Sequence, residues 1–247
     1  MDLVSIIMPY HKKREYIKSA ILSVLNQTYQ NFEVYIIFDD KNKDDLGFIN
    51  EIVALDNRIN LIVNKNNLGA GESRNLAMKK CSGNFIAFLD CDDWWYPNKL
   101  EFQINFMNEK KSFFTHTSYN IVDKDNKIIG YRNSKSVIDF SSLLKSCDVG
   151  LSTVVIKKDL LGSDISFPNL TTKEDYVLWL RLAQKGYKVY GIDKILTNWR
   201  KTINSLSSSN FQKIMDGYKV YNKYMGFGYI KSILYLFRLS INALKKK

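Results

Sequence analysis

The stretch LVSIIMPYHKKREYIKSAILSVLNQTYQNFEVYIIF, residues 3–38, changes its hydrophobic periodicity twice. Residues 3–8 and 32–38 are short apolar runs of the kind found in buried strands. Between them, residues 15–27 place Ile17, Ile21, Val24 and Leu25 at helical spacing. A buried strand, a helix and a second buried strand in this order predict a parallel βαβ unit.

The same alternation continues to residue 89. We expect helices at 44–55 and 71–81 and buried strands at 59–64 and 84–89, which together predict an open α/β sheet. In such sheets, ligands bind beyond the carboxyl ends of the strands. Polar or turn-forming residues follow each predicted strand, namely Pro9-Tyr10-His11, Asp39-Asp40, residues 64–67 and Asp90 to Asp93.

The rest of the chain has a mixed pattern. Short strands are expected at 113–119, 127–131, 152–157 and 187–192, with a helix at 173–186, a polar loop at 200–210 and a helix at 211–224. This pattern predicts a mixed α+β region supported on the first half of the same domain. No internal repeat or low-complexity segment divides the chain.

Composition describes an ordinary globular protein with a basic surface. The 247 residues are 45% apolar and 25% charged, and the formal net charge is +11, which favours anionic partners. Cys81, Cys91 and Cys147 show no CxxC spacing, so neither a zinc knuckle nor a disulfide framework is indicated, and a reducing cytoplasm fits best. No run approaches the roughly 20 apolar residues needed to cross a bilayer.

The final segment, residues 229–247, has the pattern of a basic amphipathic helix. Ile230, Ile233, Leu234, Phe237, Ile241 and Leu244 fall on one helical face. The helix either packs on the domain or docks on an anionic membrane. Its terminal lysines, Lys245 to Lys247, favour peripheral membrane contact.

Three carboxylates, Asp90, Asp92 and Asp93, stand in four positions directly after the strand predicted at 84–89. In extended backbone, residues i and i+2 share a face, so Asp90 and Asp92 are expected to approach one divalent cation, Mg²⁺ or Mn²⁺. Asp93 is expected to turn away and hydrogen-bond the loop. The alternative is a solvated acidic turn that caps the next helix at Pro97 or Asn98.

Three other groups of polar residues are candidates for binding or catalysis. Asp39-Asp40 forms an Asx turn or accepts the N–H of a base. Arg74 follows the glycines of NLGAGESRN, residues 67–75, and its guanidinium suits a phosphate or a base edge. Glu174-Asp175 begins a helix, either as a cap that complements the helix dipole or as a general base in a cleft. There is no GxGxxG after the first strand and no GxxxxGK[ST] anywhere, which disfavours a dinucleotide oxidoreductase and a P-loop NTPase.

Taken together, these motifs resemble those of family 2 glycosyltransferases over about residues 3–208. The resemblance is carried by residues 4–33, the acid pair at 39–40, NLGAGESRN, GNFIAFLDCDDWWYPNKL at 83–100 and KEDYVLWLRLAQKG at 173–186. It implies the GT-A fold, an α/β architecture with a mostly parallel central sheet flanked by helices. Residues 1–110 would form the nucleotide-sugar half, 111–208 the acceptor and catalytic half, and 209–247 a helical appendage.

The resemblance also implies the activity: inverting, metal-dependent transfer of a sugar from a nucleotide diphosphate, in this family commonly UDP, to a hydroxyl group. The acceptor would be a saccharide or a lipid-linked glycan in surface polysaccharide or glycoconjugate biosynthesis. A protein of this kind would act in the cytoplasm or on the inner face of the cell membrane and would not bind nucleic acid.

By position, the resemblance assigns a role to each candidate residue. Asp90-Cys91-Asp92 matches the DxD motif, with Asp92 the direct metal ligand, Asp90 beside it and Cys91 a spacer near the ribose. Asp175 matches the catalytic base. The residues expected to meet the nucleotide are Pro9, His11, one of Asp39 and Asp40, and Arg74. Arg200 and Lys201 are expected to neutralise the diphosphate from a later loop, or else to form a solvated basic loop.

Two departures from the family pattern affect the nucleotide site. Residues 39–45 read DDKNKDD in place of DDGSTD, and NWRKT at 198–202 lacks a histidine two residues after the arginine. Trp94 and Trp95 either line the sugar or acceptor site or pack in the core, and core packing is expected for at least one. Two alternative functions are a sugar-phosphate nucleotidyltransferase and a non-catalytic basic module that binds nucleotide or nucleic acid.

Overall fold

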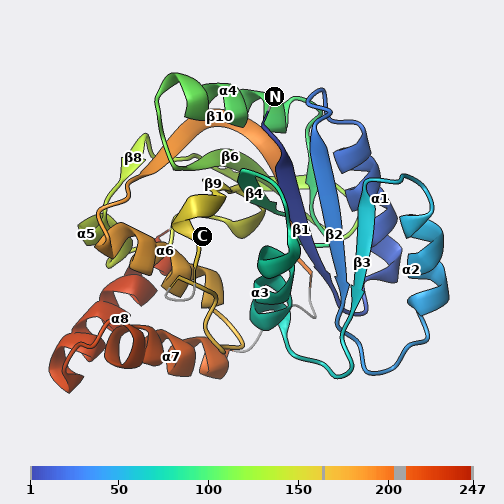
Figure 1. Ribbon diagram of the computed structural model, residues 1–247. Helices are drawn as coiled ribbons and strands as arrows, with labels where there is room; N and C mark the ends of the chain where they lie inside the picture. Colours follow the sequence, from blue (N-terminus) through green and yellow to red (C-terminus); the bar gives the residue numbers. More distant parts are fainter. Residues whose placement is uncertain (1, 163–164, 203–209, 246–247) are drawn as a thin grey trace.

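The computed structural model describes residues 2–162, 165–202 and 210–245. In its first half, strands β1 (Val4–Tyr10), β2 (Phe32–Phe38), β3 (Ile59–Val63) and β4 (Phe85–Phe88) alternate with helices α1 (Arg14–Leu25), α2 (Leu46–Val53) and α3 (Ala70–Lys80). β1 pairs in parallel with β2 and β4, and β2 pairs in parallel with β3. The predicted parallel βαβ units are therefore confirmed (Figure 1).

The second half extends the same sheet in the order β4-β9-β6-β10-β5. Its elements are β5 (Trp94–Trp95), α4 (Lys99–Glu109), β6 (Phe114–Val122), β7 (Ile128–Arg132), β8 (Val137–Ile138), α5 (Phe140–Leu143), the 3-10 turn η1 (Leu151–Thr153), β9 (Val155–Lys157), the 3-10 turn η2 (Lys158–Leu160), α6 (Glu174–Gln184) and β10 (Val189–Arg200). β9 is antiparallel to β4 and β6, whereas β6 and β10 are parallel. The expected mixed region thus continues the first sheet.

Helices cover both faces of the sheet because successive strand residues point to opposite sides. Ile6 and Met8 belong to a core with α1, α2 and α4, whereas Ile7 and Ile37 belong to a second core with α3 and α6. This double burial explains why the early strands are continuous apolar runs.

The strand predicted at 187–192 is longer than expected. β10 continues to Arg200, and its pairing with β6 shifts register twice, between Ile192 and Ile195 and between Ile195 and Thr197. These irregularities accommodate the charged pair Asp193-Lys194, which interrupts the apolar pattern in the sequence. Arg200 therefore belongs to a strand, which corrects its placement in a polar loop.

The C-terminal region consists of α7 (Asn210–Lys219), the π-helical turn η4 (Val220–Tyr224) and α8 (Tyr229–Leu244). α8 buries Ser232 and Leu239 and packs Tyr235 and Leu236 against the core. The helix therefore packs on the domain, but through a different face from the apolar one identified in the sequence.

Parts of three predictions lie outside the described residues: the polar loop at 200–210, the domain border at 208/209, and Lys246 and Lys247. The other predicted border, 110/111, falls between α4 and β6. Within the described residues, every helix is too short or too polar to cross a membrane.

Candidate active site

The carboxyl ends of β1, β2 and β4 bring distant polar segments together. The His11 Nδ1 atom lies 3.0 Å from the backbone oxygen of Asp39, and the Cys91 thiol donates to the backbone oxygen of Pro9 at 3.2 Å. This edge of the sheet is where an open α/β fold binds its ligand. The predicted nucleotide residues from these three strands are therefore neighbours in the structure.

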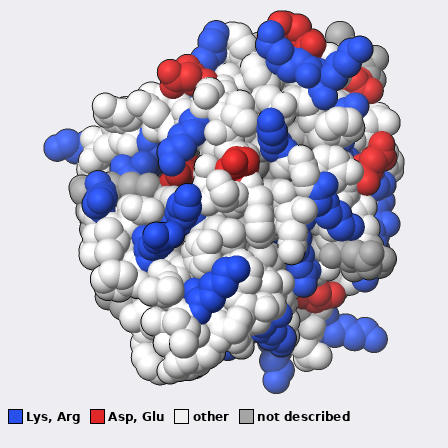
Figure 2. Space-filling model, turned by 90° about the vertical axis from the view of Figure 1, so that its left-hand side faces the viewer, with Lys and Arg blue, Asp and Glu red and all other residues white. Residues whose placement is uncertain are grey.

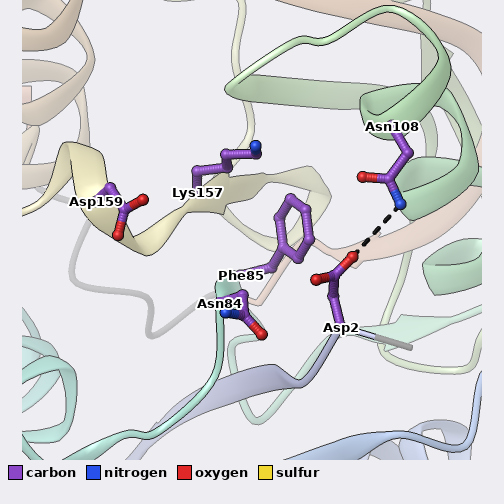
Figure 3. A pocket seen from close by; sticks show the side chains of 6 residues that line it. All are labelled: Asp2, Asn84, Phe85, Asn108, Lys157 and Asp159. Atoms are coloured by element: carbon purple, nitrogen blue, oxygen red, sulfur yellow. Dashed lines mark hydrogen bonds between the residues drawn. The ribbon is translucent and has the colours of Figure 1, made fainter.

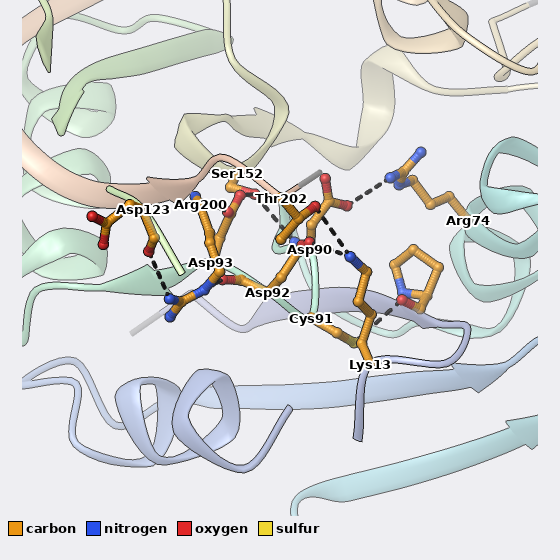
Figure 4. Close-up of polar contacts among 11 residues, drawn as sticks. Lys13, Arg74, Asp90, Cys91, Asp92, Asp93, Asp123, Ser152, Arg200 and Thr202 are labelled. Atoms are coloured by element: carbon orange, nitrogen blue, oxygen red, sulfur yellow. Dashed lines mark hydrogen bonds and ion pairs between the residues drawn. The ribbon is translucent and has the colours of Figure 1, made fainter. Parts of the chain in front are cut away.

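The acidic segment after β4 is a turn and not an extended strand. The Asp93 N–H donates to the backbone oxygen of Asp90 at 3.0 Å, which closes the turn around Cys91 and Asp92. The expectation that extended geometry places Asp90 and Asp92 on one face is therefore wrong. The two carboxylates contact different cations, Arg74 at 2.7 Å from Asp90 and Lys13 at 2.8 Å from Asp92 (Figure 4).

Asp93 is buried and turned away from the other two acids, as expected. Its carboxylate accepts a hydrogen bond from the Ser152 hydroxyl at 2.6 Å and from the Arg200 N–H at 2.8 Å. Ser152 also accepts the Asp90 N–H at 3.1 Å, so it fixes both ends of the turn. Burial, and then the charges of Asp92 and Asp90, raise the pKa of Asp93 well above its usual range.

Arg74 connects the acidic turn to the start of α6. Its guanidinium donates to Asp90 at 2.7 Å and to Glu174 at 2.9 Å, and only 3% of its side chain is exposed. Burial alone disfavours the charged form, but the two carboxylates outweigh it and raise the arginine pKa further. Arg74, which was predicted to contact the nucleotide, is thus also ion-paired with Glu174 on α6.

Asp175 stands beside Glu174 in the first turn of α6 and is only partly exposed. One of its oxygens accepts the Tyr176 N–H at 2.7 Å. Burial, and then the charge of Glu174, raise the pKa of Asp175 to about 7. A carboxylate with this pKa is well matched to accept a proton near neutral pH.

Arg200 is a buried anchor of the acidic turn. Its side chain donates to the backbone oxygens of Asp92, Asp123 and Lys124 and to the Asn126 side chain. It also lies over the rings of Tyr16 and Trp94, at 4.4 and 4.8 Å from their centres. The alternative of a solvated basic residue is wrong for Arg200, whereas the adjacent Lys201 is exposed.

The structure distinguishes Asp39 from Asp40. Asp39 accepts hydrogen bonds from the Asn64 side chain and from the N–H groups of Leu68 and Gly69, each at 2.8 Å. Both of its oxygens are thereby engaged in holding the loop before α3. Asp40 accepts the Asn42 N–H at 3.1 Å through one oxygen, which is the predicted Asx turn.

Trp95 is a core residue. It is buried, and its indole N–H donates to the Ser152 backbone oxygen at 2.7 Å. Trp94 is partly exposed beneath the Arg200 guanidinium. Core packing, expected for at least one of the two tryptophans, is therefore confirmed for Trp95.

Sequence reasoning missed Lys13 as part of the site. Lys13 lies in the turn after β1, and its ammonium group contacts Asp92 and, at 3.4 Å, the Thr202 hydroxyl (Figure 4). The signal was present in the basic run His11 to Arg14 directly after the first strand. What the sequence lacked was any indication of which of these side chains faces the acidic turn.

A polar hollow lies at the opposite end of the strands and is separate from this site. It has a volume of about 170 Å³ and is lined by Asp2, Asn84, Phe85, Asn108, Lys157 and Asp159 (Figure 3). Asp2, Asn84 and Phe85 lie at the amino ends of β1 and β4, and Lys157, the last residue of β9, pairs with Phe85. Ligands of parallel sheets bind at the other end, so we exclude this hollow from the active site.

The sequence is similar to known proteins over most of its length. Residues 5–157 match the family model "Glycosyl transferase family 2". The chain is 37% identical over 246 residues to the Escherichia coli UDP-Glc:alpha-D-GlcNAc-diphosphoundecaprenol beta-1,3-glucosyltransferase WfaP, covering 100% of this chain and 96% of that protein. It is 30% identical over 246 residues to the Bacillus subtilis putative teichuronic acid biosynthesis glycosyltransferase TuaG, covering 99% and 97%.

Two solved structures share the fold. S. aureus TarS in complex with UDP-GlcNAc matches with a TM-score of 0.72 at 22% identity, covering 89% of this chain and 64% of that chain. The mannosyltransferase PcManGT from Pyrobaculum calidifontis, in complex with GDP-Man and Mn2+, matches with a TM-score of 0.68 at 13% identity, covering 98% and 73%.

The fold and these relatives define a glycosyltransferase with the GT-A architecture. The chain belongs to glycosyl transferase family 2. The alternatives of a nucleotidyltransferase and of a non-catalytic module are therefore set aside.

Proposed function

We propose that this glycosyltransferase moves a hexose from a UDP-sugar to a hydroxyl of a lipid-linked saccharide, with inversion at the anomeric carbon. Two E. coli relatives, each 37% identical over almost the whole chain, are named as transferring glucose from UDP-Glc to GlcNAc-diphosphoundecaprenol. UDP-glucose and that acceptor are accordingly the first substrates to test. The product would enter surface polysaccharide or glycoconjugate synthesis.

The observation that carries this proposal is the Arg74 bridge. Asp90 and Glu174 are far apart in the chain, yet both contact one buried guanidinium. The acidic turn of the donor site and the acid pair at the start of α6 are thereby held side by side. Asp175, directly after Glu174, is the carboxylate in this arrangement whose pKa of about 7 suits a base.

In the proposed reaction, Asp175 accepts the proton of the acceptor hydroxyl. The hydroxyl oxygen forms a bond to the anomeric carbon while the bond from that carbon to the diphosphate oxygen breaks. The diphosphate leaves with the electron pair, and a single displacement of this kind inverts the anomeric centre. Arg74 and Glu174 act as positioning residues because they fix the start of α6 against the donor side.

Asp90 and Asp92 suit a divalent metal. Their side chains are 35% and 16% exposed, and both offer the hard oxygen donors that Mg²⁺ and Mn²⁺ prefer. Burial, and then the charge of Asp90, raise the pKa of Asp92, so additional positive charge there would be stabilising. When bound, such a metal would stabilise the negative charge that develops on the departing diphosphate.

Water and donor phosphates would supply the remaining ligands. Within residues 2–162, 165–202 and 210–245, no group of three or more His, Cys, Asp or Glu side chains is arranged to hold a metal. One or two carboxylates completed by water and substrate phosphate are the usual Mg²⁺ arrangement in nucleotide sites.

At the nucleobase end, we assign Asp40 to the N–H of the uracil ring. Both oxygens of Asp39 already accept hydrogen bonds that hold the loop before α3, whereas Asp40 accepts the Asn42 N–H through one oxygen and has more remaining capacity to accept a hydrogen bond. Pro9 and His11 would line the base and Cys91 the ribose, because they lie at the adjacent ends of β1 and β4. Lys201, exposed after β10, would face the diphosphate.

The test is a transfer assay with radiolabelled UDP-glucose and a synthetic GlcNAc-diphospholipid. We expect a disaccharide-lipid whose new linkage is β when examined by NMR, and loss of transfer with EDTA that Mn²⁺ restores. UDP-GlcNAc and GDP-mannose serve as alternative donors. An α linkage would refute inversion, and activity unaffected by EDTA would refute the metal.

We also propose that α7 and α8 hold the enzyme on the inner face of the cell membrane. The exposed apolar residues include Phe211, Ile214 and Met215 on α7 and Tyr229, Ile230, Ile233, Leu234, Phe237 and Leu244 on α8. Residues 210–245 carry six lysines and arginines but one acid, Asp216, which is buried. An apolar surface among basic residues suits an anionic lipid surface.

The charge distribution on this side agrees with that partner. Lys and Arg side chains are spread over the left-hand face of the molecule, between broad uncharged areas (Figure 2). On α8, Lys231, Leu234, Tyr235 and Arg238 line a hollow of about 280 Å³, in which two cations flank an apolar floor. A lipid phosphate would suit the two cations, and the acyl chain of the same lipid would suit the apolar floor.

Vesicle co-sedimentation tests the membrane contact. Leu234→Asp with Phe237→Asp should abolish binding to phosphatidylglycerol vesicles and leave transfer to a short-chain, water-soluble acceptor intact. Ile128→Asp, at an exposed apolar residue of β7, is the matched control. Equal sedimentation of all three proteins, or binding that is insensitive to lipid charge, would contradict the assignment.

A further inference from the structure

Lys13 occupies the position at which a cation would bind Asp92. Its ammonium nitrogen lies 2.8 Å from Asp92 Oδ2 and 3.4 Å from the Thr202 hydroxyl. The contacts join the turn after β1, the acidic turn after β4 and the residue two positions beyond β10 (Figure 4). The donor site therefore already contains an internal counter-ion.

The two cations at the acidic turn differ in how firmly they are held. Arg74 is 3% exposed and is paired with both Asp90 and Glu174, so it is fixed in place. The Lys13 side chain is 25% exposed and has Asp92 as its carboxylate partner. A lysine is a point charge on a flexible stem, so Lys13 is the cation of this pair that can exchange.

A divalent metal and the Lys13 ammonium cannot share Asp92 without mutual repulsion. Metal binding therefore requires Lys13 to leave, which costs its ion pair. A nucleoside diphosphate beside the metal offers the displaced ammonium a new anionic partner. This new ion pair offsets the cost of breaking the Lys13–Asp92 ion pair. Metal and nucleotide therefore each strengthen the binding of the other.

We propose that Lys13 is an exchangeable counter-ion that makes metal binding at Asp92 depend on the nucleoside diphosphate. The ammonium of Lys13 moves from Asp92 to the diphosphate when the metal and nucleotide enter together. The inference rests on the metal site of the proposed function. The inference explains why Lys13 lies within hydrogen-bond distance of a turn that binds a metal cation.

Mn²⁺ binding, followed by electron paramagnetic resonance with and without UDP, tests this role without using turnover. Lys13→Met should bind Mn²⁺ alone up to about fivefold more tightly than the wild type, the factor expected for loss of a partly exposed ion pair. UDP should strengthen Mn²⁺ binding to this variant less than to the wild type. Lys18→Met, at an exposed lysine of α1, should behave like the wild type, and Lys13→Arg, which keeps the charge, should bind Mn²⁺ alone no more tightly than the wild type.

The outcomes separate the two proposals. If the wild type binds Mn²⁺ with UDP, but Lys13→Met binds Mn²⁺ alone no more tightly than the wild type, the counter-ion role is overturned and the metal site stands. If the wild type binds no Mn²⁺ even with UDP, both the metal site and the counter-ion role are overturned. If Lys18→Met also binds Mn²⁺ more tightly than the wild type, the loss of one positive charge explains the tighter binding of Lys13→Met. The assignment to Lys13 would then be overturned as well.

Discussion

Replacing Asp175 with Asn tests the proposed base while keeping the side chain's size. A general base contributes about 10²- to 10⁴-fold to a rate, so single-turnover sugar transfer should fall by about that factor. UDP binding should be retained because Asp175 lies at the start of α6 and not at the strand ends that form the nucleotide site. The assay is rapid-quench transfer from UDP-glucose, with UDP affinity measured by calorimetry.

The dependence of the wild-type transfer rate on pH is a second test of Asp175. With a pKa of about 7, Asp175 is roughly 90% ionised at pH 8 and roughly 10% at pH 6, so transfer should fall about tenfold between them. Glu174→Gln keeps the base but removes the neighbouring negative charge, so the midpoint of the profile should move to lower pH. Burial, the larger cause of the raised pKa, stays in place, so the midpoint should remain above the ordinary value for Asp.

Stability should change in the opposite direction to activity. Because the folded pKa is raised, the folded protein retains a proton on Asp175 between pH 3.8 and about 7 that the unfolded chain releases. The ionised carboxylate therefore costs stability that grows through this window, to at most about 4 kcal/mol above pH 7. Asp175→Asn should melt at a higher temperature than the wild type at pH 8 and at a similar temperature at pH 4.

Wild-type transfer that is flat between pH 6 and 8, or Asp175→Asn turnover equal to the wild type, would refute the role of Asp175. Equal melting temperatures at pH 8 would refute the argument from burial. A folded, UDP-binding variant that cannot transfer sugar would support the role of Asp175, and a higher melting temperature at pH 8 would support the argument from burial.

Three further substitutions test the site. Arg74→Met leaves the carboxylates of Asp90 and Glu174 without their shared cation and should cost about 3–5 kcal/mol in chemical denaturation; a cost below about 1 kcal/mol would contradict the bridge. Asp93→Ala leaves two buried donors without an acceptor and should cost about 2–6 kcal/mol. That cost should be larger at pH 5 than at pH 8, because the raised pKa makes the wild-type carboxyl easier to bury when protonated. Asp40→Asn should weaken UDP binding at an unchanged melting temperature; normal UDP affinity would remove Asp40 from the nucleobase site.

The fold was largely predictable because its signals are local. The change from strand to helical periodicity gave the first four strands and three helices, and the continuous apolar runs indicated burial on both faces. β10 was only partly predicted, because Asp193 and Lys194 break the pattern where the strand is irregular. The direction of α8 packing was missed because that helix is apolar on more than one side.

The candidate site was predicted as a set of residues but not as a set of contacts. Asp90, Asp92 and Asp175 were recognisable from motif and position. Their partners were not, since Arg74 and Glu174 are separated by 100 positions, and Lys13 follows β1 whereas Asp92 follows β4. No local periodicity encodes such pairs.

The sequence by itself determined the order of strands and helices and the residue types placed at the strand ends. The tertiary structure decided which carboxylate holds a loop, which is paired with a cation and which remains available to accept a proton. The physical reason is that hydrophobic periodicity acts over a few residues, whereas desolvation and charge pairing depend on distances in space. Asp39, Asp93 and Asp175 are the same residue type, and only their surroundings give them different roles.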